Sequence, residues 1–260
     1  TYTVSVQDAS GCPATGTGVV GDTPAQYSGT TTQVSCPGGN DGTATAFITP
    51  LAAGVTYLWS NGQTTQTATG LSAGTYTCNV STPSGCSGVV TVNVTEIPGM
   101  VLSLTNVVNA TCNSINNGTA TAVVIQGTPG YTYQWTGSAS VSNIAIDLGA
   151  GTHTLTVTDA NGCIVDTTFV INEPPPLSIA FLTQDTMICP EATITLTAQG
   201  AGGSSPYIFN WVDNNGNTFG PSSSITVDPA GSPTQYCVTL SEQCGSPTTQ
   251  DCLNITFPTP

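Results

Sequence analysis

The sequence predicts an all-β chain built from tandem β-sandwich repeats, and three observations lead to this prediction. The three tryptophans, Trp59, Trp135 and Trp211, are evenly spaced, since 135 − 59 and 211 − 135 both equal 76. Charged residues make up only 5% of the chain, while Thr, Val, Gly and Pro are abundant, a composition that disfavours helices. Apolar residues alternate with polar ones, which is the pattern of strands. A period this long indicates tandem domains rather than the short coils of a solenoid.

The period divides the chain into four segments, which we number repeats one to four. Repeat one contains the C-terminal strands of a truncated repeat, repeats two and three are similar sandwiches, and repeat four is divergent, with boundaries at residues 1–23, 24–98, 99–175 and 176–260. About seven short alternating strands in each full repeat are typical of a two-sheet sandwich. Because each repeat has its own core residues and residues 174–176 are three prolines, we expect an elongated array with few contacts between repeats.

The strands follow from the alternation of apolar residues. In repeat one, Tyr2, Val4 and Val6 alternate and are expected to point inward. In repeat two the turn signals Asn40-Asp41-Gly42 and Asn61-Gly62 separate strands expected over residues 44–48, 55–59, 76–80 and 90–94. Repeats three and four contain the same parts around their own tryptophans.

The core is predicted from the same register. We expect the three aligned tryptophans to be buried, together with the residue that begins the penultimate strand of each repeat, namely Tyr76, His153 and Tyr236. The run Gly74-Thr75-Tyr76 resembles the tyrosine corner of immunoglobulin-like domains. The row Tyr131, Tyr133 and Trp135 would suit sugar stacking if it faced solvent, but its parity favours the core.

The absence of positive charge limits the partners. The chain has no Lys or Arg and a formal charge of −14. Nucleic acid, anionic membrane surfaces and phosphate ligands are therefore not expected as partners. No apolar run is long enough to span a membrane, so we expect no direct membrane insertion. The missing basic residues serve either solubility or resistance to proteases.

Ten cysteines indicate an oxidising, extracellular compartment. In repeats two and three the opening cysteine and the later Gly-Cys cysteine are expected to pair, as Cys36–Cys86 and Cys112–Cys163. Each bridge would close a loop of about 50 residues and contribute about 4 kcal/mol. Cys12 occupies the Gly-Cys position of repeat one, so its partner is expected upstream.

Repeat four carries two extra cysteines. Cys237 and Cys252 alternate with inward-facing residues and should therefore face outward. This favours a cross-strand bridge Cys237–Cys252 together with Cys189–Cys244, whereas the alternative joins Cys189 to Cys237 and Cys244 to Cys252. Cys78 shares inward parity with its neighbours and is expected to be a buried free thiol.

Several segments together resemble a known family. Asn61-Gly62-Gln63-Thr64-Thr65, Leu71-Ser72-Ala73-Gly74-Thr75-Tyr76 and Thr156-Val157-Thr158-Asp159-Ala160-Asn161-Gly162-Cys163 are similar to the SprB-type repeat of giant surface adhesins in gliding Bacteroidetes. The resemblance covers residues 25–175, with residues 1–22 as a truncated copy, and repeat four is more similar to PKD-like domains. It implies type IX secretion, a cell-surface location and a role in adhesion and gliding. The departures are His153 in place of Tyr, Thr82-Pro83-Ser84 in place of Asp-Ala-Asn, and Cys78.

Other candidate sites have simple structural interpretations. His153 is the only histidine, and its alignment with Tyr76 favours a structural role over catalysis. The turns at Asp8, Asp41 and Asp159 have oxygen ligands for calcium but too few carboxylates for a tight site. Asp185-Thr186-Met187 resembles a short O-glycosylation signal, which makes Thr186 a candidate. No cofactor and no enzyme activity are expected.

The favoured function is a non-catalytic stalk of a surface adhesin or filament that separates a distal binding region from the cell. The alternatives are repeats that bind carbohydrate, spacers of a secreted enzyme, and subunits of a laterally packed filament or sheath. Without Lys, the edge strands lack a common guard against strand addition. Because the Thr and Ser faces have no large apolar patch, we expect the edges to be exposed rather than covered by other chains.

Overall fold

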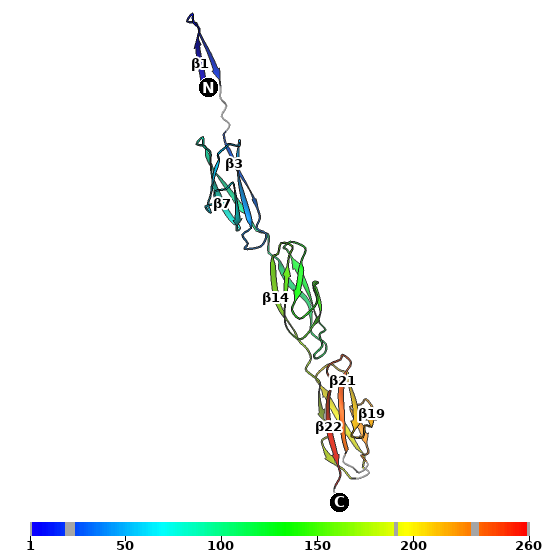
Figure 1. Cartoon of the computed structure of the whole chain (residues 1–260). Helices are drawn as coiled ribbons and strands as arrows, with labels where there is room; N and C mark the ends of the chain where they lie inside the picture. The colour runs from blue at the N-terminus through cyan, green and yellow to red at the C-terminus, as the bar shows by residue number, and fades with distance from the viewer. Residues whose placement is uncertain (1, 19–23, 190–191, 230–233, 259–260) are drawn as a thin grey trace. The chain divides into compact units, whose positions relative to one another are not determined.

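The computed structural model describes residues 2–18, 24–189, 192–229 and 234–258 (Figure 1). Within these ranges the secondary structure consists of strands, turns and loops, and no helix is long and apolar enough to cross a membrane. The chain divides into two compact units, Thr1–Gly99 and Met100–Pro260. We describe each unit by itself.

Repeat one is a single hairpin. Strands β1 (Tyr2–Gln7) and β2 (Pro13–Gly18) pair antiparallel through the turn that contains Asp8. The prediction that Tyr2, Val4 and Val6 point into a core is wrong, because these side chains are 61–67% exposed. Alternating apolar residues place side chains on one face of a strand, but a second sheet must pack on that face to bury them. In the described part of the chain, no other strand packs on the β1–β2 hairpin.

Repeat two is a sandwich of two three-stranded sheets. One sheet has the order β3-β4-β6 and the other β5-β7-β8. Their bounds are β3 (Gln26–Thr32), β4 (Gly42–Thr49), β5 (Thr56–Trp59), β6 (Thr67–Leu71), β7 (Gly74–Ser81) and β8 (Ser87–Val94). This repeat has six strands rather than about seven, and residues 60–66 form turns and loop in which Thr65 O accepts the Trp59 indole N–H.

The first strand of repeat two crosses from one sheet to the other. After β3 ends, Val34 forms a parallel bridge with Glu96, beyond the end of β8. The Val34 N–H donates to Thr95 O at 2.9 Å, and the Ile97 N–H donates to Val34 O at 3.1 Å. The crossing places the following loop, which contains Cys36, beside the end of the last strand.

Repeat three has the same topology. Its sheets have the orders β12-β10-β9 and β11-β13-β14. The bounds are β9 (Val101–Val108), β10 (Gly118–Ile125), β11 (Thr132–Trp135), β12 (Ile144–Leu148), β13 (Gly151–Thr158) and β14 (Ile164–Ile171). The same crossing occurs, since the Ala110 N–H donates to Asn172 O at 2.9 Å just beyond β14.

Repeat four keeps this arrangement and extends one sheet. The three-stranded sheet has the order β15-β17-β20, and the five-stranded sheet has the order β16-β22-β21-β18-β19. The bounds are β15 (Ser178–Phe181), β16 (Thr186–Met187), β17 (Ile194–Ala201), β18 (Tyr207–Asp213), β19 (Thr218–Phe219), β20 (Ser224–Val227), β21 (Thr234–Glu242) and β22 (Thr249–Thr256). Strand β16 pairs parallel with the last strand, β22, which is the crossing seen in the other repeats.

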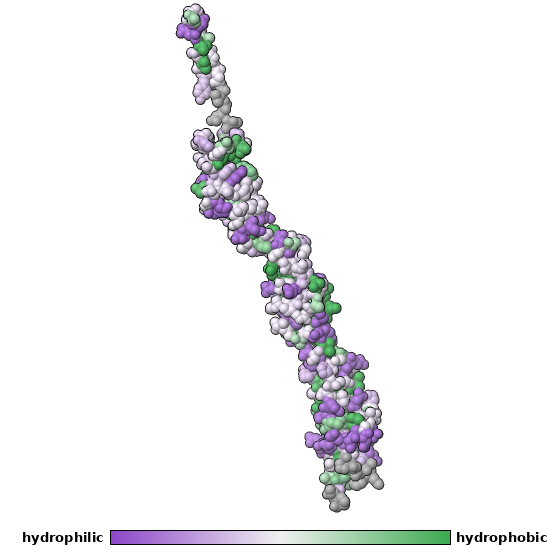
Figure 2. Space-filling view, viewed as in Figure 1, coloured by the Kyte–Doolittle hydropathy of each residue, from purple (hydrophilic) through white to green (hydrophobic). Residues whose placement is uncertain are grey.

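Each full repeat has one hydrophobic core between its two sheets. The core residues lie within residues 34–94, 110–171 and 177–255. Sheet spacing in repeat two depends on Gly29 of β3, where a Cβ atom would lie only 2.6 Å from Val92 Cγ1. Figure 2 shows hydrophobic residues on the visible face in separate patches among neutral and hydrophilic ones. The prediction of tandem β-sandwiches is confirmed.

Candidate functional site

The aligned tryptophans lie in the cores. Trp59, Trp135 and Trp211 are 2%, 4% and 1% exposed. Each indole N–H donates to a backbone carbonyl in the loop that follows, with distances of 2.9, 2.9 and 2.8 Å to Thr65, Ser142 and Ser222. The ring planes are therefore out of reach of a sugar, and each indole fixes a loop across its own sandwich.

The neighbouring tyrosines also form internal contacts. Tyr131 Oη donates to Gln126 O at 2.8 Å, and Tyr207 Oη donates to Gly202 O at 2.6 Å. Both rings are half-buried at the end of a sandwich. The hydroxyl groups thus hold the loop that precedes the tryptophan strand.

His153 takes the structural position of Tyr76. Tyr76 Oη donates to the carbonyl four residues earlier, Ser72 O, at 3.1 Å, which is a tyrosine-corner contact. His153 Nε2 lies 2.8 Å from Gly149 O, again four residues earlier, and Nδ1 lies 2.7 Å from Thr136 O. The imidazole is 7% exposed and packs on Phe169 with ring centroids 5.6 Å apart. Both ring nitrogens face carbonyl oxygens, so neither faces a nucleophile.

Replacing this imidazole is expected to affect stability. His153→Ala should cost about 2–4 kcal/mol, because it removes buried packing and the imidazole N–H that donates to one of the two facing carbonyl groups. His153→Tyr should cost less than half as much, because a tyrosine at this position can bond the carbonyl four residues earlier. Urea unfolding of both variants checks this. Equal losses for the two variants would contradict the equivalence with Tyr76.

The aspartates of the tight turns cap their own loops. Oδ1 of Asp159 accepts the N–H groups two and four residues later, from Asn161 and Cys163, both at 2.9 Å. Asp8 and Asp213 make the same pair of bonds. In Thr82-Pro83-Ser84 the hydroxyl replaces the carboxylate, since Thr82 Oγ1 accepts the Cys86 N–H at 3.1 Å. The carboxylate oxygens are engaged with the backbone, and the described residues hold no group of three or more potential metal ligands.

These bonds lower the carboxyl pKa values. The pKa of Asp159 lies below its ordinary value chiefly because the Thr128 N–H donates to Oδ2 at 3.0 Å. The Ser10 hydroxyl lowers the pKa of Asp8, and the Asn217 side-chain amide lowers that of Asp213. Since the folded pKa values are depressed, the unfolded chain binds protons first as the pH falls.

The chain is therefore expected to lose stability in acid. The contribution of these turns is complete above the unfolded pKa of about 3.9 and is lost as the pH falls through the lower folded pKa values. Urea midpoints at pH 6 and pH 3 check this, and the midpoint at pH 3 should be lower. Asp159→Asn should lower the midpoint at pH 6 and reduce the difference between the two pH values. An unchanged midpoint at pH 3 would contradict the capping role.

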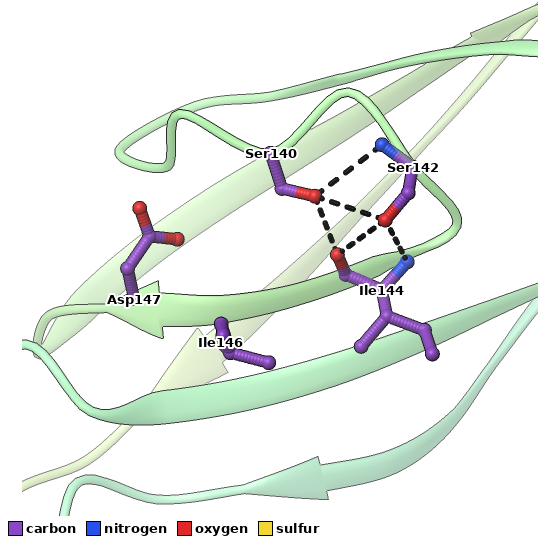
Figure 3. Close-up of a pocket in the computed structure, with 5 residues that line it drawn as sticks. All are labelled: Ser140, Ser142, Ile144, Ile146 and Asp147. Carbon is purple, nitrogen blue, oxygen red and sulfur yellow. Dashed lines mark hydrogen bonds between the residues drawn. The ribbon is translucent and has the colours of Figure 1, made fainter.

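A shallow groove lies on repeat three along β12 and the loop before it. It has a volume of about 550 Å³ and is lined by Ser140, Ser142, Ile144, Ile146 and Asp147 (Figure 3). The Ser142 hydroxyl donates to Ile144 O at 2.9 Å, and the Ser140 hydroxyl donates to the same carbonyl. The Asp147 carboxylate instead accepts from the Ser138 hydroxyl and from the Ala139 N–H, the latter at 3.1 Å. No base is aimed at either lining serine, so the groove has no activated nucleophile.

Three of the four predicted bridges within repeats are wrong. Cys86 and Cys189 are exposed thiols, although Cys36 is disulfide-bonded. Cys112 bonds not to Cys163 but to Cys244 of repeat four, with the Cα atoms 5.9 Å apart. The Cys36–Cys86, Cys112–Cys163 and Cys189–Cys244 bridges are therefore absent.

The reason is position along the strand. Each sandwich has a head pole and a tail pole. The head pole is the turn with a cysteine before the last strand (Gly85-Cys86, Gly162-Cys163 or Cys244-Gly245), and the tail pole is where that strand ends. Cys86 precedes β8, whereas the Cys36 loop is held at the other end, where the Gly38 N–H donates to Glu96 Oε2 at 2.9 Å. The eight-residue strand β8 spans about 27 Å. A disulfide requires Cα atoms less than about 7 Å apart.

The remaining cysteines match the sequence interpretation. Cys237 and Cys252 are directly opposite on β21 and β22 and form a bridge, with Cα atoms 4.0 Å apart. Cys78 is a fully buried thiol, and its burial raises its pKa.

Thr186 lies on the short strand β16. It is half-buried, and its carbonyl accepts from Thr256 Oγ1 at 3.4 Å.

Within the second unit, repeats three and four contact each other through a disulfide and hydrogen bonds, and we call this contact the joint. Beside the Cys112–Cys244 bridge, the Asn113 N–H donates to Ser246 Oγ at 2.9 Å. From the other loop at this head pole, Ser204 Oγ donates to Thr111 O at 2.8 Å. Asn113 and Ser246 are buried. For this pair of repeats, the expectation of few contacts is wrong.

Sequence reasoning missed two glutamates that organise the tail poles. Glu96 accepts the Gly38 N–H, and Glu173 accepts the Ser114 N–H at 2.6 Å, in the loop after each opening cysteine. Their separation, 173 − 96 = 77, follows the repeat period. This spacing is the sequence signal that could have identified the two glutamates as equivalent residues of successive repeats.

Comparisons with known proteins agree with this description. The SprB repeat family matches residues 28–64 and 104–140. No curated protein matches the chain. Similar solved structures include three N-terminal domains of the outer capsid protein Hoc of bacteriophage RB49, with 14% identity over 90% of this chain and 98% of that one, and a TM-score of 0.43. Titin domains I67–I69 give 15% identity over 92% and 100%, with a TM-score of 0.36. The first four immunoglobulin domains of a Dscam1 isoform give 12% over 90% and 73%, with a TM-score of 0.34. Two segments of the chain, one in repeat two and one in repeat three, therefore match the SprB repeat family within a tandem array of β-sandwiches.

Proposed function

We propose that the chain is a non-catalytic stalk segment of a large surface adhesin or filament, which supports adhesion and gliding by separating a distal binding region from the cell. The observation that carries this proposal is the internal use of the candidate side chains. The tryptophans and His153 fix core loops, the aspartates cap turns, and Cys112 with Cys244 joins two repeats.

Composition and cysteine chemistry support a location outside the cell. Disulfides persist in oxidising compartments, and the described residues include the bridges Cys112–Cys244 and Cys237–Cys252, while Cys36 and Cys163 are disulfide-bonded as well. SprB repeats occur in surface proteins, and we include type IX secretion in the proposal on that resemblance. The partners in this role are the other repeats of the same chain.

Carbohydrate binding is the main alternative, and the groove of repeat three is the place to test it. Ile144 and Ile146 are 45% and 69% exposed there, beside serine hydroxyl groups. Lateral packing into a filament is a second alternative, because the sheets have open edges. The hydrophobic patches visible in Figure 2 are small, which favours exposed edges over an obligate interface.

A glycan array probed with the labelled 260-residue chain tests the proposal against carbohydrate binding. The expected signal equals that of an unrelated immunoglobulin-like array of similar net charge. Ile146→Ser is the matched variant, because it alters the groove at an exposed position. A glycan that binds the chain and is lost in this variant would contradict the proposal. More than about 1,000 Å² buried between chains in an assembled state would favour the filament instead.

A further inference from the structure

We propose a pairing rule, in which an opening cysteine bonds to the head-pole cysteine of another repeat as Cys112 bonds to Cys244, and we propose that the hollow around Cys86 is a docking site for the opening-cysteine loop of another such repeat. The inference does not depend on what the array carries at its tip. It rests on the positions of the cysteines within each sandwich and on one bridge between sandwiches.

The opening cysteine of a repeat and the cysteine in the turn before its last strand lie at opposite poles in repeats two, three and four. In repeat three the loop after Cys112 is bound to Glu173, because the Asn113 side-chain amide donates to Oε1 at 3.2 Å. Cys163 precedes β14, ten residues before that glutamate, since 173 − 163 = 10. Ten residues of strand span about 33 Å. The opening cysteine is therefore at the tail pole and the Gly-Cys cysteine at the head pole.

Repeat four has the same polarity despite its divergent sequence. The Ile188 N–H, next to Cys189, donates to Thr256 O at 3.0 Å, where β22 ends. Cys244 lies in the loop before β22 begins. Neither cysteine can reach the other within its repeat, and the bridge that Cys244 does form joins it to Cys112 at the tail pole of repeat three.

The joint of the second unit shows what a head pole binds. Two loops of repeat four contact the opening-cysteine loop of repeat three. The loop between β17 and β18 contributes Ser204, and the loop between β21 and β22 contributes Cys244 and Ser246. Together they hold residues 111–113 by one disulfide and two hydrogen bonds.

Repeat two presents the same two loops around an unoccupied thiol. A hollow of about 220 Å³ lies between the loop from β4 to β5 and the loop from β7 to β8. Its walls are mainly apolar, and the exposed thiol of Cys86 forms part of them, with lining residues Pro24, Ala25, Ile48, Pro50, Ala52, Thr82, Ser84 and Cys86. The equivalent position in repeat four is the bonded Cys244. The ligand that fits is therefore a short loop with a cysteine, taken from the tail pole of another SprB-type repeat.

The bond forms by thiol–disulfide exchange. The Cys86 thiol and the incoming cysteine thiol each lose a proton and together lose two electrons, and a new S–S bond forms. A disulfide donor, such as a dithiol–disulfide oxidoreductase or glutathione disulfide, accepts the electrons and becomes two thiols. Cys189, an exposed thiol at a tail pole, is the reciprocal group.

Disulfide mapping of the 260-residue chain tests the pairing rule. Free thiols are blocked with N-ethylmaleimide and the chain is unfolded. A glutamate-specific protease then cleaves after Glu96, Glu191 and Glu242 but not after Glu173, because Pro174 follows it. We expect residues 97–191 to remain joined to residues 243–260. Cys86 and Cys189 should carry the label. A Cys112–Cys163 or Cys36–Cys86 linkage would overturn the rule.

Two single substitutions sharpen the result. Cys244→Ser should separate residues 97–191 from 243–260 and make Cys112 available to the label. Cys252→Ser is the matched control, because it frees Cys237 but should leave residues 97–191 attached. A Cys112 that stays blocked in Cys244→Ser would show another partner and overturn the proposal.

The docking site is tested in the full-length surface protein isolated without reductant. Cys86 should change from fully labelled in the 260-residue chain to fully protected, and its peptide should be linked to the opening-cysteine loop of another repeat. Mapping of that peptide distinguishes a repeat of the same chain from a repeat of a second chain. Full labelling of Cys86 in this protein, or its linkage to Cys36, would overturn the docking site.

Discussion

Breaking the Cys112–Cys244 bridge is expected to lengthen the stretched second unit by about 400 Å. The intact Cys237–Cys252 bridge encloses Cys244, so the path under tension grows from the 8 residues between Cys244 and Cys252 to the 125 residues between Cys112 and Cys237. The gain is 125 − 8 = 117 residues, and an extended residue spans about 3.4 Å. With the bridge intact, a pulling force passes through the sulfur atoms and cannot extend the chain between them. The measurement is single-molecule force spectroscopy, with handles at the linker around residues 98–99 and at the C-terminal end. The double variant Cys112→Ser, Cys244→Ser should show the added length.

The Cys237–Cys252 bridge provides the control for that experiment. Its cysteines are 15 residues apart, on adjacent strands. Its removal alone should add less than about 50 Å, because an extended residue spans about 3.4 Å. Equal extension of the two variants would contradict a bridge between repeats three and four.

Trp135→Ala is expected to cost repeat three about 3–5 kcal/mol. The substitution leaves a cavity in the core and removes the donor that holds Ser142 O at 2.9 Å. Since domains are stable by about 5–15 kcal/mol, this loss brings the sandwich close to unfolding. Amide hydrogen exchange should therefore accelerate in β11 and β13.

A nearby surface position serves as the matched control. Val141 is 82% exposed in the loop next to Ser142, so Val141→Ala should change stability by less than about 0.5 kcal/mol. Exchange in β5 and β7 of repeat two, around Trp59, gives a second reference within the same molecule. Unchanged exchange in Trp135→Ala would show that the indole does not anchor the core.

Much of the fold could be predicted because register determines which face of a strand is buried. The alternation around Trp59 and Trp135 places these rings inside, and both are buried. Parity also identified the outward pair Cys237 and Cys252, which face each other across two strands. Burial on a two-sided sheet has a period of two residues, so these predictions require only local sequence.

Cysteine pairing within repeats two and three could not be predicted in this way. Register specifies a face of the sheet, but it does not say at which end of an eight-residue strand a neighbouring loop lies. The crossing of the first strand at Val34 moves the Cys36 loop to the tail pole, and this crossing depends on long-range pairing with Glu96. The inward prediction for Tyr2 failed for a related reason, because a strand face is buried only when another sheet packs on it.

The roles of the candidate site residues are predicted better by their equivalents in the neighbouring repeats than by the chemistry of their side chains. His153 has the residue type of a catalytic base, yet its Nε2 atom makes the contact that Tyr76 Oη makes in repeat two. The carboxylate of Asp159 is typical of calcium turns, yet it accepts three backbone N–H groups. In a repeat protein, the role of an unusual residue is best read from its equivalent in the next repeat.

The stalk function is tested most directly by exchanging the segment in the full-length surface protein. Residues 24–258 are replaced by three unrelated immunoglobulin-like sandwiches, and a second strain carries a deletion of the same residues. Surface amounts of the proteins are matched, and adhesion and gliding are measured. The spacer function predicts that the exchange retains both activities and that the deletion reduces them. Loss of adhesion on exchange, with normal amounts at the surface, would show that these repeats bind a partner themselves and would contradict the account.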